Sequence, residues 1–523
     1  MTVEHDAARI PQGSAVRRLT ASIEDARAGR GFGAVVQEVW YVAITVGLSV
    51  LFVTGIADSI RGTVTARPGA VTLTGELPAA LVVLVAAGGL VSLAGRMGPV
   101  GLGGGGAAWW LPMPVDRRGL LRPTVLKWPL VSAGVGVVVA PLSLLLFGAD
   151  VSVAALAEWA AVGAAGFALL AGGAALLQRF GRASRMLAVA GDLVMLVAAV
   201  AIAGVALTGQ DVSGWTLGGA WPTAAVLALG AAVTTVLAER HSDRLSGSGL
   251  RDRGSVGDRT QVAVLSLDLR ELSGALTVAP ERVRRRGSLR LAAGGARRAV
   301  VLADLVLMSR APRQVAQVLV AALFAVAAGR VALTQSGLPL YGVWLVTGFW
   351  AANAAAAGAR HADLAPVLDR LLPLSARDVR VARGAVPLLA ATVWTLAAAG
   401  AQSLSGADPL WLALAPPWAA VLAAAAVRGA YRPPPRWVAS TLASPMGGVP
   451  PTGGLFKGLD VALVGTLPTA ITLYIGRLTE PLVIAQWVLA AVVVTFLVLM
   501  TGRAKKASSG RGGPALSRSP GRR

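Results

Sequence analysis

The sequence of 523 residues is 55% hydrophobic and only 14% charged, and its mean hydropathy is +0.66. Water-soluble domains carry about 25% charged residues, so this composition excludes a water-soluble globule and predicts an all-helical, polytopic integral membrane protein. The net charge of +22 does not indicate a nucleic-acid partner, because Arg and Lys gather at the cytoplasmic ends of membrane spans. The lack of Cys excludes disulfides and thiolate metal sites.

The apolar runs divide the chain into two membrane halves. Residues 1–34 are polar, and residues 14–31 predict an amphipathic helix lying on the membrane surface. The first half, residues 35–238, contains six apolar runs, at 35–56, 77–95, 128–148, 152–177, 187–207 and 217–238. The second half, residues 313–502, contains six more, at 313–333, 338–358, 384–404, 409–427, 458–476 and 481–502. Each run has about the length that crosses a bilayer, so we expect twelve spans as two repeated six-helix halves.

Two further segments are basic. Residues 239–312 form an Arg-rich linker, in which residues 299–310 predict a second interfacial helix, placed before its half as the first one is. Residues 503–523 form a tail rich in Gly, Ser and Pro that we expect to be disordered. Clustered Arg attracts anionic lipid by about 1 kcal/mol per residue, so anionic lipid is an expected partner here. The alternative interpretation of the linker is a solvated connection between the halves.

The distribution of basic residues predicts the orientation. If alternate connections are cytoplasmic, the opposite set holds only Arg61, Arg67, Arg330 and Arg477, which leaves 44 of the 48 Arg and Lys on one side. Cytoplasmic connections are enriched in Arg and Lys. The sequence therefore predicts a multi-pass protein of the cell (plasma) membrane with both termini in the cytoplasm.

Two similar segments follow the second run of each half. Residues 111–122 read LPMPVDRRGLLR and residues 371–383 read LLPLSARDVRVAR. Aligning them matches a Pro, a short polar residue and an Arg at one spacing: Pro114, Asp116 and Arg118 with Pro373, Ser375 and Arg377. This match indicates an internal duplication. Asp or Ser can cap a helix, and the following Arg residues would then project from a short amphipathic helix. The alternative is that these Arg residues only hold the cytoplasmic side by charge.

Residues that carry chemistry are scarce. The sequence lacks the phosphate loop GxxxxGK[ST], so we expect no ATPase activity in this chain. The three His have no partner at ligand spacing, which predicts no metal site and no bound cofactor. No Ser, His and carboxylate pattern of a hydrolase is present either, so we expect the chain not to be an enzyme.

Four polar residues lie inside the predicted spans: Glu158, Asn353, Gln402 and Gln486. Polar groups in a membrane are costly to bury and are functional candidates for that reason. The alternative is that they form hydrogen bonds between neighbouring helices.

The layout and the two segments resemble the ABC-2-type transporter permease family. In that family the connection between the second and third spans commonly reads LPVSRR or LPLSRRE, and the second segment is close to this pattern. The first segment departs from it by an inserted Pro and by Asp116 in place of Ser. The doubled chain is also similar to an uncharacterised family of actinobacterial membrane proteins. The resemblance implies an exporter whose separate ATP-binding subunit, in two copies, contacts eight residues: Pro114, Asp116, Arg117, Arg118, Pro373, Ser375, Arg377 and Asp378.

Two other classes of function stay open. A major-facilitator-type secondary transporter also has twelve spans in two halves, and DRRGLLR at 116–122 resembles its G-x-x-x-D-R-x-G-R-R pattern, although Pro112 stands where the first Gly is expected. The other alternative is a non-transporting membrane scaffold or an intramembrane enzyme. A proton-dependent substrate flux by the isolated chain would favour the secondary transporter.

Overall fold

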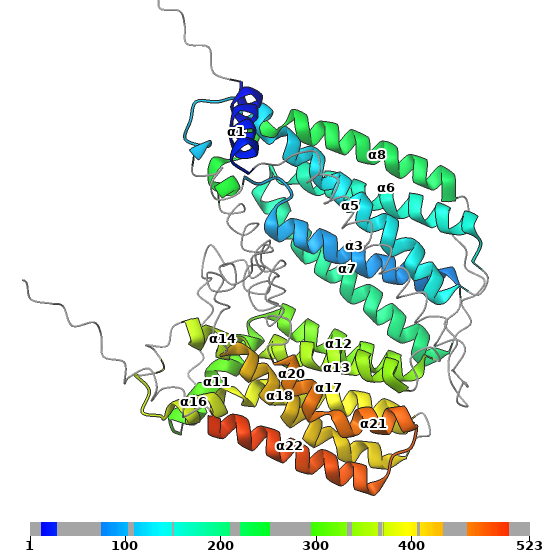
Figure 1. Cartoon of the computed structure of the whole chain (residues 1–523), viewed down its shortest axis with the longest axis vertical. Coiled ribbons are helices and arrows are strands. Elements are labelled where there is room, and N and C mark those ends of the chain that lie inside the picture. The colour runs from blue at the N-terminus through cyan, green and yellow to red at the C-terminus, as the bar shows by residue number, and fades with distance from the viewer. Residues whose placement is uncertain are drawn as a thin grey trace, which may run out of the picture. The chain divides into compact units, whose positions relative to one another are not determined.

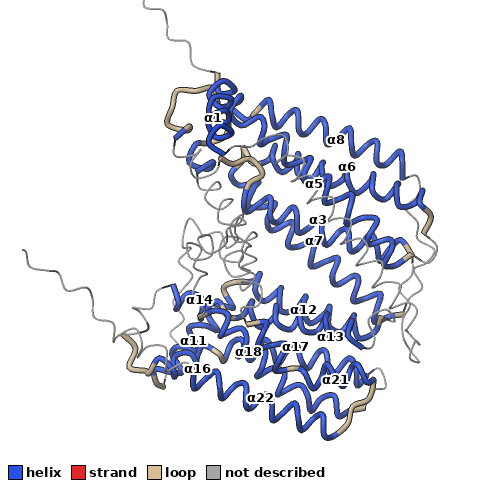
Figure 2. Tube along the Cα trace, in the orientation of Figure 1, coloured by secondary structure: helices blue, strands red, loops and turns tan. Residues whose placement is uncertain are grey.

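The computed structural model of the chain describes residues 12–28, 75–102, 109–148, 151–209, 220–251, 294–331, 337–364, 369, 371–404, 408–431 and 458–500. Within these ranges the chain forms helices joined by short loops and contains no strand (Figure 2). The predicted all-helical fold class is confirmed. Three predicted segments lie wholly or largely outside the described residues: the run at 35–56, the linker at 239–312 and the tail at 503–523.

The described helices belong to two compact units, the first formed by the helices before residue 252 and the second by those after residue 293 (Figure 1). Unit 1 contains α1 (Gly13–Ala28), α3 (Glu76–Met97), α5 (Arg117–Phe147), α6 (Val153–Leu177), α7 (Gly181–Thr208), α8 (Ala220–Arg240) and the 3-10 turn η1 (Ser242–Arg244). Unit 2 contains α11 (Ala296–Ser309), α12 (Pro312–Arg330), α13 (Gly337–Ala355), α14 (Ala357–Leu364), α16 (Ala376–Arg383), α17 (Ala385–Leu404), η2 (Pro409–Leu414), α18 (Ala415–Ala430), α20 (Leu459–Gly465), α21 (Leu467–Ile475) and α22 (Glu480–Met500).

Eight helical segments in the described part are long and apolar enough to cross a membrane: Glu76–Met97, Arg117–Phe147, Val153–Leu177, Met186–Thr208, Ala220–Arg240, Pro312–Arg330, Ala376–Ser403 and Pro409–Ala430. The chain is therefore a multi-pass membrane protein. The predicted runs at 338–358 and 481–502 coincide with α13 and α22, which are not among these eight. The arrangement of twelve spans in two repeated halves stays a prediction.

Glycines bring the long helices of unit 1 into close contact. A Cβ atom added at Gly136 of α5 would collide with the backbone of Gly163 in α6. In the same way, a Cβ atom at Gly191 of α7 would collide with the backbone of Ser92 in α3. The hydroxyl group of Ser92 donates a hydrogen bond of 2.6 Å to Asp192, so a polar contact lies beside this close approach. Small residues at such positions are typical of helix packing in membranes.

Four tryptophans form the centre of unit 2. Trp344 of α13 contacts Trp394, Trp411 and Trp418 edge-to-face, at ring-centroid distances of 6.4, 6.0 and 5.9 Å. Trp394 and Trp418 stack in parallel at 5.7 Å. The indole N–H groups of Trp344 and Trp394 donate to backbone carbonyls of α12, so these polar atoms are satisfied within the core. The cluster joins α13, α17, η2 and α18 into one rigid group.

The predicted span at 458–476 is broken in the structure. Helices α20 and α21 meet at Thr466, whose φ of −113° and ψ of 12° are not helical. Pro468 has no N–H group and cannot continue the helical hydrogen bonding across the junction. Gln486 of α22 donates a bond of 2.6 Å to the carbonyl of Gly465, and the Tyr341 hydroxyl donates one of 3.3 Å to a carbonyl of α20. Side chains from neighbouring helices thus satisfy the backbone groups that the break exposes.

Candidate functional site

The first repeated segment folds as a tight turn centred on Pro114. The N–H of Val115 donates a 2.9 Å hydrogen bond to the carbonyl of Met113, across the proline. The N–H of Met113 in turn donates a 3.2 Å bond to the carbonyl of Trp110. Because the proline has no N–H group, its neighbours supply all the donors of this turn. The Pro114 side chain is exposed.

The second segment folds in the same way around Pro373. The N–H of Leu374 donates a 2.8 Å bond to the carbonyl of Leu372, and the N–H of Leu372 donates a 3.3 Å bond to the carbonyl of Asp369. Relative to the proline, donors and acceptors occupy the same positions as in the first segment. The sequence match between the segments therefore corresponds to one shared backbone geometry, which we call the Pro-centred turn.

Each Pro-centred turn ends in a helix cap, as the sequence predicts. The carboxylate of Asp116 accepts hydrogen bonds from the backbone N–H groups of Arg118 (3.1 Å) and Gly119 (2.9 Å) at the start of α5. The hydroxyl of Ser375 accepts one of 3.1 Å from the N–H of Asp378 at the start of α16. Both side chains satisfy amide groups that have no partner within the helix. The prediction that these two residues act as caps is confirmed.

The helices that follow the caps lead into membrane spans. The sequence predicts a short amphipathic helix in both segments, and for the first one this is wrong, because α5 continues for 31 residues from Arg117 to Phe147. Its three internal prolines do not interrupt it, in keeping with the tolerance of membrane helices for Pro. In the second segment α16 has eight residues and passes through Gly384 into α17. The N–H of Gly384 donates to the carbonyls of Arg380 and Val381, which keeps the junction hydrogen-bonded.

Ion pairs fix the first segment to the end of α8. The guanidinium group of Arg118 donates two hydrogen bonds to Glu239, of 3.1 and 2.9 Å. Arg122 lies 3.8 Å from the same carboxylate. Arg117 is exposed and makes one long contact, of 3.5 Å, with the carbonyl of Leu245. Arg118 is therefore held within the unit, whereas Arg117 is directed to solvent.

In the second segment, the polar residues divide between internal and outward roles. Asp378 accepts hydrogen bonds of 2.7 Å from the Ser375 hydroxyl and 2.7 Å from Arg297 of α11. Arg383 pairs at 2.9 Å with both Asp304 and Asp369. Burial raises the pKa of Asp304, and the positive charge of Arg383 opposes this change.

Arg377 is the outward-facing cation of this segment. Its side chain is exposed, and it makes no ion pair within the described part of the chain. Pro373 and Ser375 beside it are also exposed. The second Pro-centred turn therefore presents an unpaired positive charge to solvent.

An interfacial helix packs on each Pro-centred turn. Helix α1 lies across the end of unit 1 at which α5 begins (Figure 1), where Arg17 donates a 2.7 Å bond to the carbonyl of Leu120. Gly13 of α1 lies so close to the carbonyl of Asp116 that a Cβ atom there would overlap it. Helix α11 holds the second segment through Arg297 and Asp304. Helices are present near both predicted positions, at Gly13–Ala28 for 14–31 and at Ala296–Ser309 for 299–310, and their location on the membrane surface stays a prediction.

Sequence reasoning missed the residues that hold the segments in place. These residues are Arg17, Glu239, Arg297 and Asp304. One signal was available for the last of them, because Asp304 is the only polar residue in the stretch 299–308. A lone carboxylate on the apolar face of a helix needs a cationic partner when it is buried. Nothing in the local sequence indicates which Arg supplies it.

The four intramembrane polar candidates lie apart from the Pro-centred turns and have different surroundings. Gln486 is fully buried and bridges α21 and α22, because its Oε1 accepts a 3.0 Å bond from the hydroxyl of Thr469 and its Nε2 donates to α20. For this residue the prediction of a bond between helices is confirmed. Gln402 is buried against α12, and its Nε2 has no hydrogen-bond partner in the described part of the chain. Asn353 accepts hydrogen bonds from Arg360, and Glu158 is half-buried in the second turn of α6.

Comparison with known families places the chain in one of them. Residues 70–440 match the family of unknown function DUF6297. The chain belongs to this family. No curated protein and no solved structure matches the chain. The region that matches DUF6297 includes both Pro-centred turns and α11, so these features lie within the part of the chain that defines the family.

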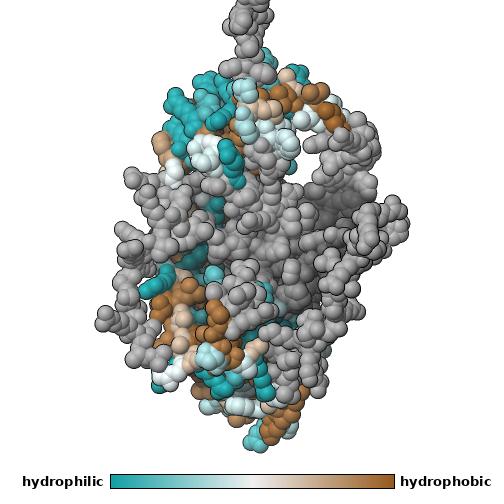
Figure 3. All heavy atoms as spheres, turned by 90° about the vertical axis from the view of Figure 1, so that its left-hand side faces the viewer, coloured by the Kyte–Doolittle hydropathy of each residue, from teal (hydrophilic) through white to brown (hydrophobic). Residues whose placement is uncertain are grey.

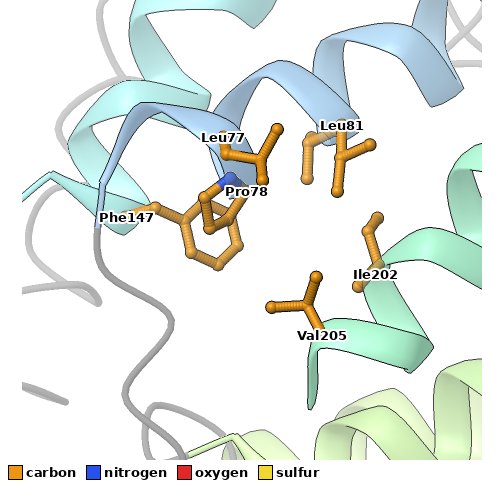
Figure 4. A pocket seen from close by; sticks show the side chains of 7 residues that line it. Leu77, Pro78, Leu81, Phe147, Ile202 and Val205 are labelled. Atoms are coloured by element: carbon orange, nitrogen blue, oxygen red, sulfur yellow. The ribbon is translucent and has the colours of Figure 1, made fainter. Parts of the chain in front are cut away.

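One hollow in unit 1 of this DUF6297 protein is apolar. It lies between α3, α7 and the end of α5 and is lined only by apolar side chains, including Leu77, Phe147 and Ile202 (Figure 4). It offers no polar group that could orient a ligand. Among the described residues, no three His, Asp or Glu side chains lie close enough to hold a metal ion.

Proposed function

We propose that this DUF6297 protein is the membrane permease component of an ABC-type exporter, and that two copies of a separate ATP-binding subunit dock on its two Pro-centred turns. The chain has no phosphate loop, so in this proposal ATP hydrolysis belongs to the partner. The turns, both termini and the basic linker lie on the cytoplasmic side of the plasma membrane, as the distribution of Arg and Lys predicts. The resemblance of both segments to the ABC-2-type pattern supports the same assignment.

One observation carries the proposal: each Pro-centred turn is joined through a capped helix to a membrane span. In unit 1 a single helix runs from Arg117, beside the turn, to Phe147. In unit 2 the path runs through α16 and a hydrogen-bonded junction into α17. A helix with its terminal amides satisfied is stiff, so a displacement of the turn moves the span with it. This is what a docking segment must do if a soluble motor is to move membrane helices.

The packing of α1 and α11 on the turns supports a mechanical role. Each interfacial helix lies at the cytoplasmic end of its unit in the proposed orientation, and each contacts the residues directly after the turn. Ion pairs such as Arg118 with Glu239 and Arg383 with Asp304 tie the turn to the bundle at two points or more. The pair of Arg383 with Asp304 is partly buried, so breaking it would leave a charge uncompensated, whereas the pair of Arg118 with Glu239 is exposed and costs less to break.

The proposal is tested by charge reversal at the two outward-facing arginines. The variant Arg117→Glu with Arg377→Glu should keep its membrane insertion, because neither side chain forms an ion pair within the described part of the chain. It should lose association with the candidate ATP-binding subunit. An Arg paired with a partner carboxylate is worth roughly 2 to 5 kcal/mol on disruption, so recovery of the complex should fall by orders of magnitude. The measurement is copurification, together with stimulated ATPase activity.

Arg118 requires a different design, because its reversal alone would also break an internal ion pair. The exchange Arg118→Glu with Glu239→Arg keeps that pair and reverses the charge on α5. If Arg118 contacts the partner, the exchanged protein is stable and fails to copurify. The control is Arg285→Glu with Arg286→Glu in the basic linker, which should leave recovery unchanged. Equal recovery of all these variants and the wild type, or a larger loss from the linker control, would refute docking at the turns.

A further inference from the structure

A cationic hollow lies between α1 and the start of α5 in unit 1. Its charged lining comes from α1, α5 and α8, and it consists of Arg17, Arg18, Arg118, Arg122, Asp116 and Glu239. Hydrophilic side chains gather at the end of unit 1 where α1 lies (Figure 3). Four arginines face two carboxylates, so the hollow has a net positive charge.

The two carboxylates already have partners within the protein. Asp116 accepts hydrogen bonds from two amide groups at the start of α5, and Glu239 accepts two from Arg118. Arg18 is exposed and makes no ion pair in the described part of the chain. The side chain of Arg122 is 65% exposed, and its contact with Glu239 is long, at 3.8 Å. Two guanidinium groups are therefore available to an anion from outside, and Arg forks match phosphate oxygens well.

The hollow continues into an apolar surface along α5. Arg122, Leu126 and Leu130 follow one another at intervals of four residues, so they share one face of this membrane-spanning helix. Leu126 is 41% and Leu130 73% exposed within the unit. On the other side of the hollow, α1 exposes Leu19. A ligand that fills this surface needs an anionic head and a long apolar tail attached to it.

We propose that this hollow binds the phosphate of an anionic phospholipid, with an acyl chain lying along Leu126 and Leu130. Arg18 from α1 and Arg122 from α5 hold the phosphate between them. The lipid thereby joins the interfacial helix to the first membrane span that follows the Pro-centred turn. Asp116 and Arg118, which also line the hollow, are assigned to docking in the proposed function, whereas Arg18 and Arg122 are not. Lipid binding through these two arginines can therefore be tested separately from docking.

The test uses the full chain in mild detergent and native mass spectrometry with added dioleoyl phosphatidylglycerol. The variant Arg18→Gln with Arg122→Gln should bind this lipid about 20-fold more weakly or worse, at about fivefold per arginine. Arg244→Gln with Arg251→Gln is the matched control, because both residues are exposed in unit 1, lie outside the hollow and carry the same charge. Its affinity for the lipid should not change. Phosphatidylcholine has the same phosphate, but its choline cation offsets the charge, so it should bind more weakly than phosphatidylglycerol to the wild type and lose less affinity in the double variant.

Inorganic phosphate in large excess distinguishes a lipid site from a free-phosphate site. The lipid should stay bound, because free phosphate gains nothing from the apolar face of α5. Displacement by phosphate, or an equal loss of lipid from the control variant, would overturn the proposal. The single variant Arg18→Gln keeps the test decisive if the double variant does not fold, because this exposed side chain has no internal ion pair to lose; it should bind about fivefold more weakly.

Discussion

Single glycines determine how closely the helices of unit 1 approach one another. Gly191 of α7 faces the backbone of α3, where a Cβ atom would collide with Ser92. Gly204 lies on the same helix, and a Cβ atom there would meet nothing within 4 Å. The two glycines are alike in sequence terms and differ only in what stands opposite them. A glycine that faces the backbone of a neighbouring helix is therefore required for close packing, whereas one that faces open space is not.

Substitution of these two glycines by Ala should have opposite effects on stability. Ala favours a helix over Gly by up to about 1 kcal/mol at either position. At Gly191→Ala the gain is outweighed, because the backbones of α3 and α7 must separate, and overpacking costs about 1 to 3 kcal/mol. Gly204→Ala has no such cost. Unfolding in detergent is monitored by Trp fluorescence. We expect a lower unfolding midpoint for Gly191→Ala and an unchanged or higher one for Gly204→Ala. A similar midpoint for both would contradict the close contact.

Among the elements, the junction between α20 and α21 depends on a glutamine from a third helix. Gln486 of α22 is 0% exposed, donates to the carbonyl of Gly465 and accepts from the hydroxyl of Thr469. That hydroxyl also accepts a 2.7 Å bond from the indole N–H of Trp418. The break in the helix, the adjacent helix α22 and the tryptophan cluster are thus parts of one hydrogen-bonded group.

A pair of identical substitutions tests this group. Gln486→Leu removes two hydrogen bonds and leaves a buried carbonyl and hydroxyl without this partner, which should destabilise the protein by about 1 to 2 kcal/mol. Gln402→Leu removes an amide group whose buried nitrogen has no partner, so it should destabilise the protein less than Gln486→Leu does. Unfolding midpoints of both variants in detergent give the comparison. A Gln402→Leu variant less stable than Gln486→Leu would refute the assignment.

The sequence predicts the apolar helices well and their interruptions poorly. Long apolar runs are required by the bilayer itself, so their positions can be inferred from hydropathy alone. The run at 458–476 does contain Pro468, but a proline alone does not decide whether a membrane helix breaks, since three prolines lie inside the continuous helix α5. The carbonyl groups at this break are satisfied by Tyr341 and Gln486, which lie outside the run. In the same way, the helix after Asp116 was expected to be short, since no local signal shows that the bundle extends it to the span. Non-local contacts decide both cases.

For the candidate site, the sequence predicts the turns and their caps but not the contacts of the charged residues. Pro and a capping residue act within four residues of chain, so their geometry follows from local rules. Arg118 and Arg377 are equivalent in the alignment, yet the first pairs with Glu239 and the second faces solvent. The difference lies in whether another helix end supplies a carboxylate. That information is present only in the fold.

At the scale of the whole molecule, the absence of cysteine allows a direct test of orientation. A single Cys placed at Ser246 or Ser508 should be protected from an impermeant thiol reagent in intact cells, because both positions are expected in the cytoplasm. A single Cys at Gly62 should be labelled. Labelling at Ser246, or protection at Gly62, would contradict cytoplasmic termini and with them the proposed access of an ATP-binding subunit to the turns. Permeabilised cells, in which every position should react, serve as the control.

The two Pro-centred turns have different caps, so the two docking surfaces of the proposed complex are unequal. A permease assembled from two identical chains would offer the same surface twice, whereas here one turn carries the anionic cap Asp116 and the other the neutral cap Ser375. The adjoining arginines differ as well, since Arg118 is bound within its unit and Arg377 is open. In the proposed complex, two identical motor subunits would therefore meet unequal electrostatic surfaces and release at different rates.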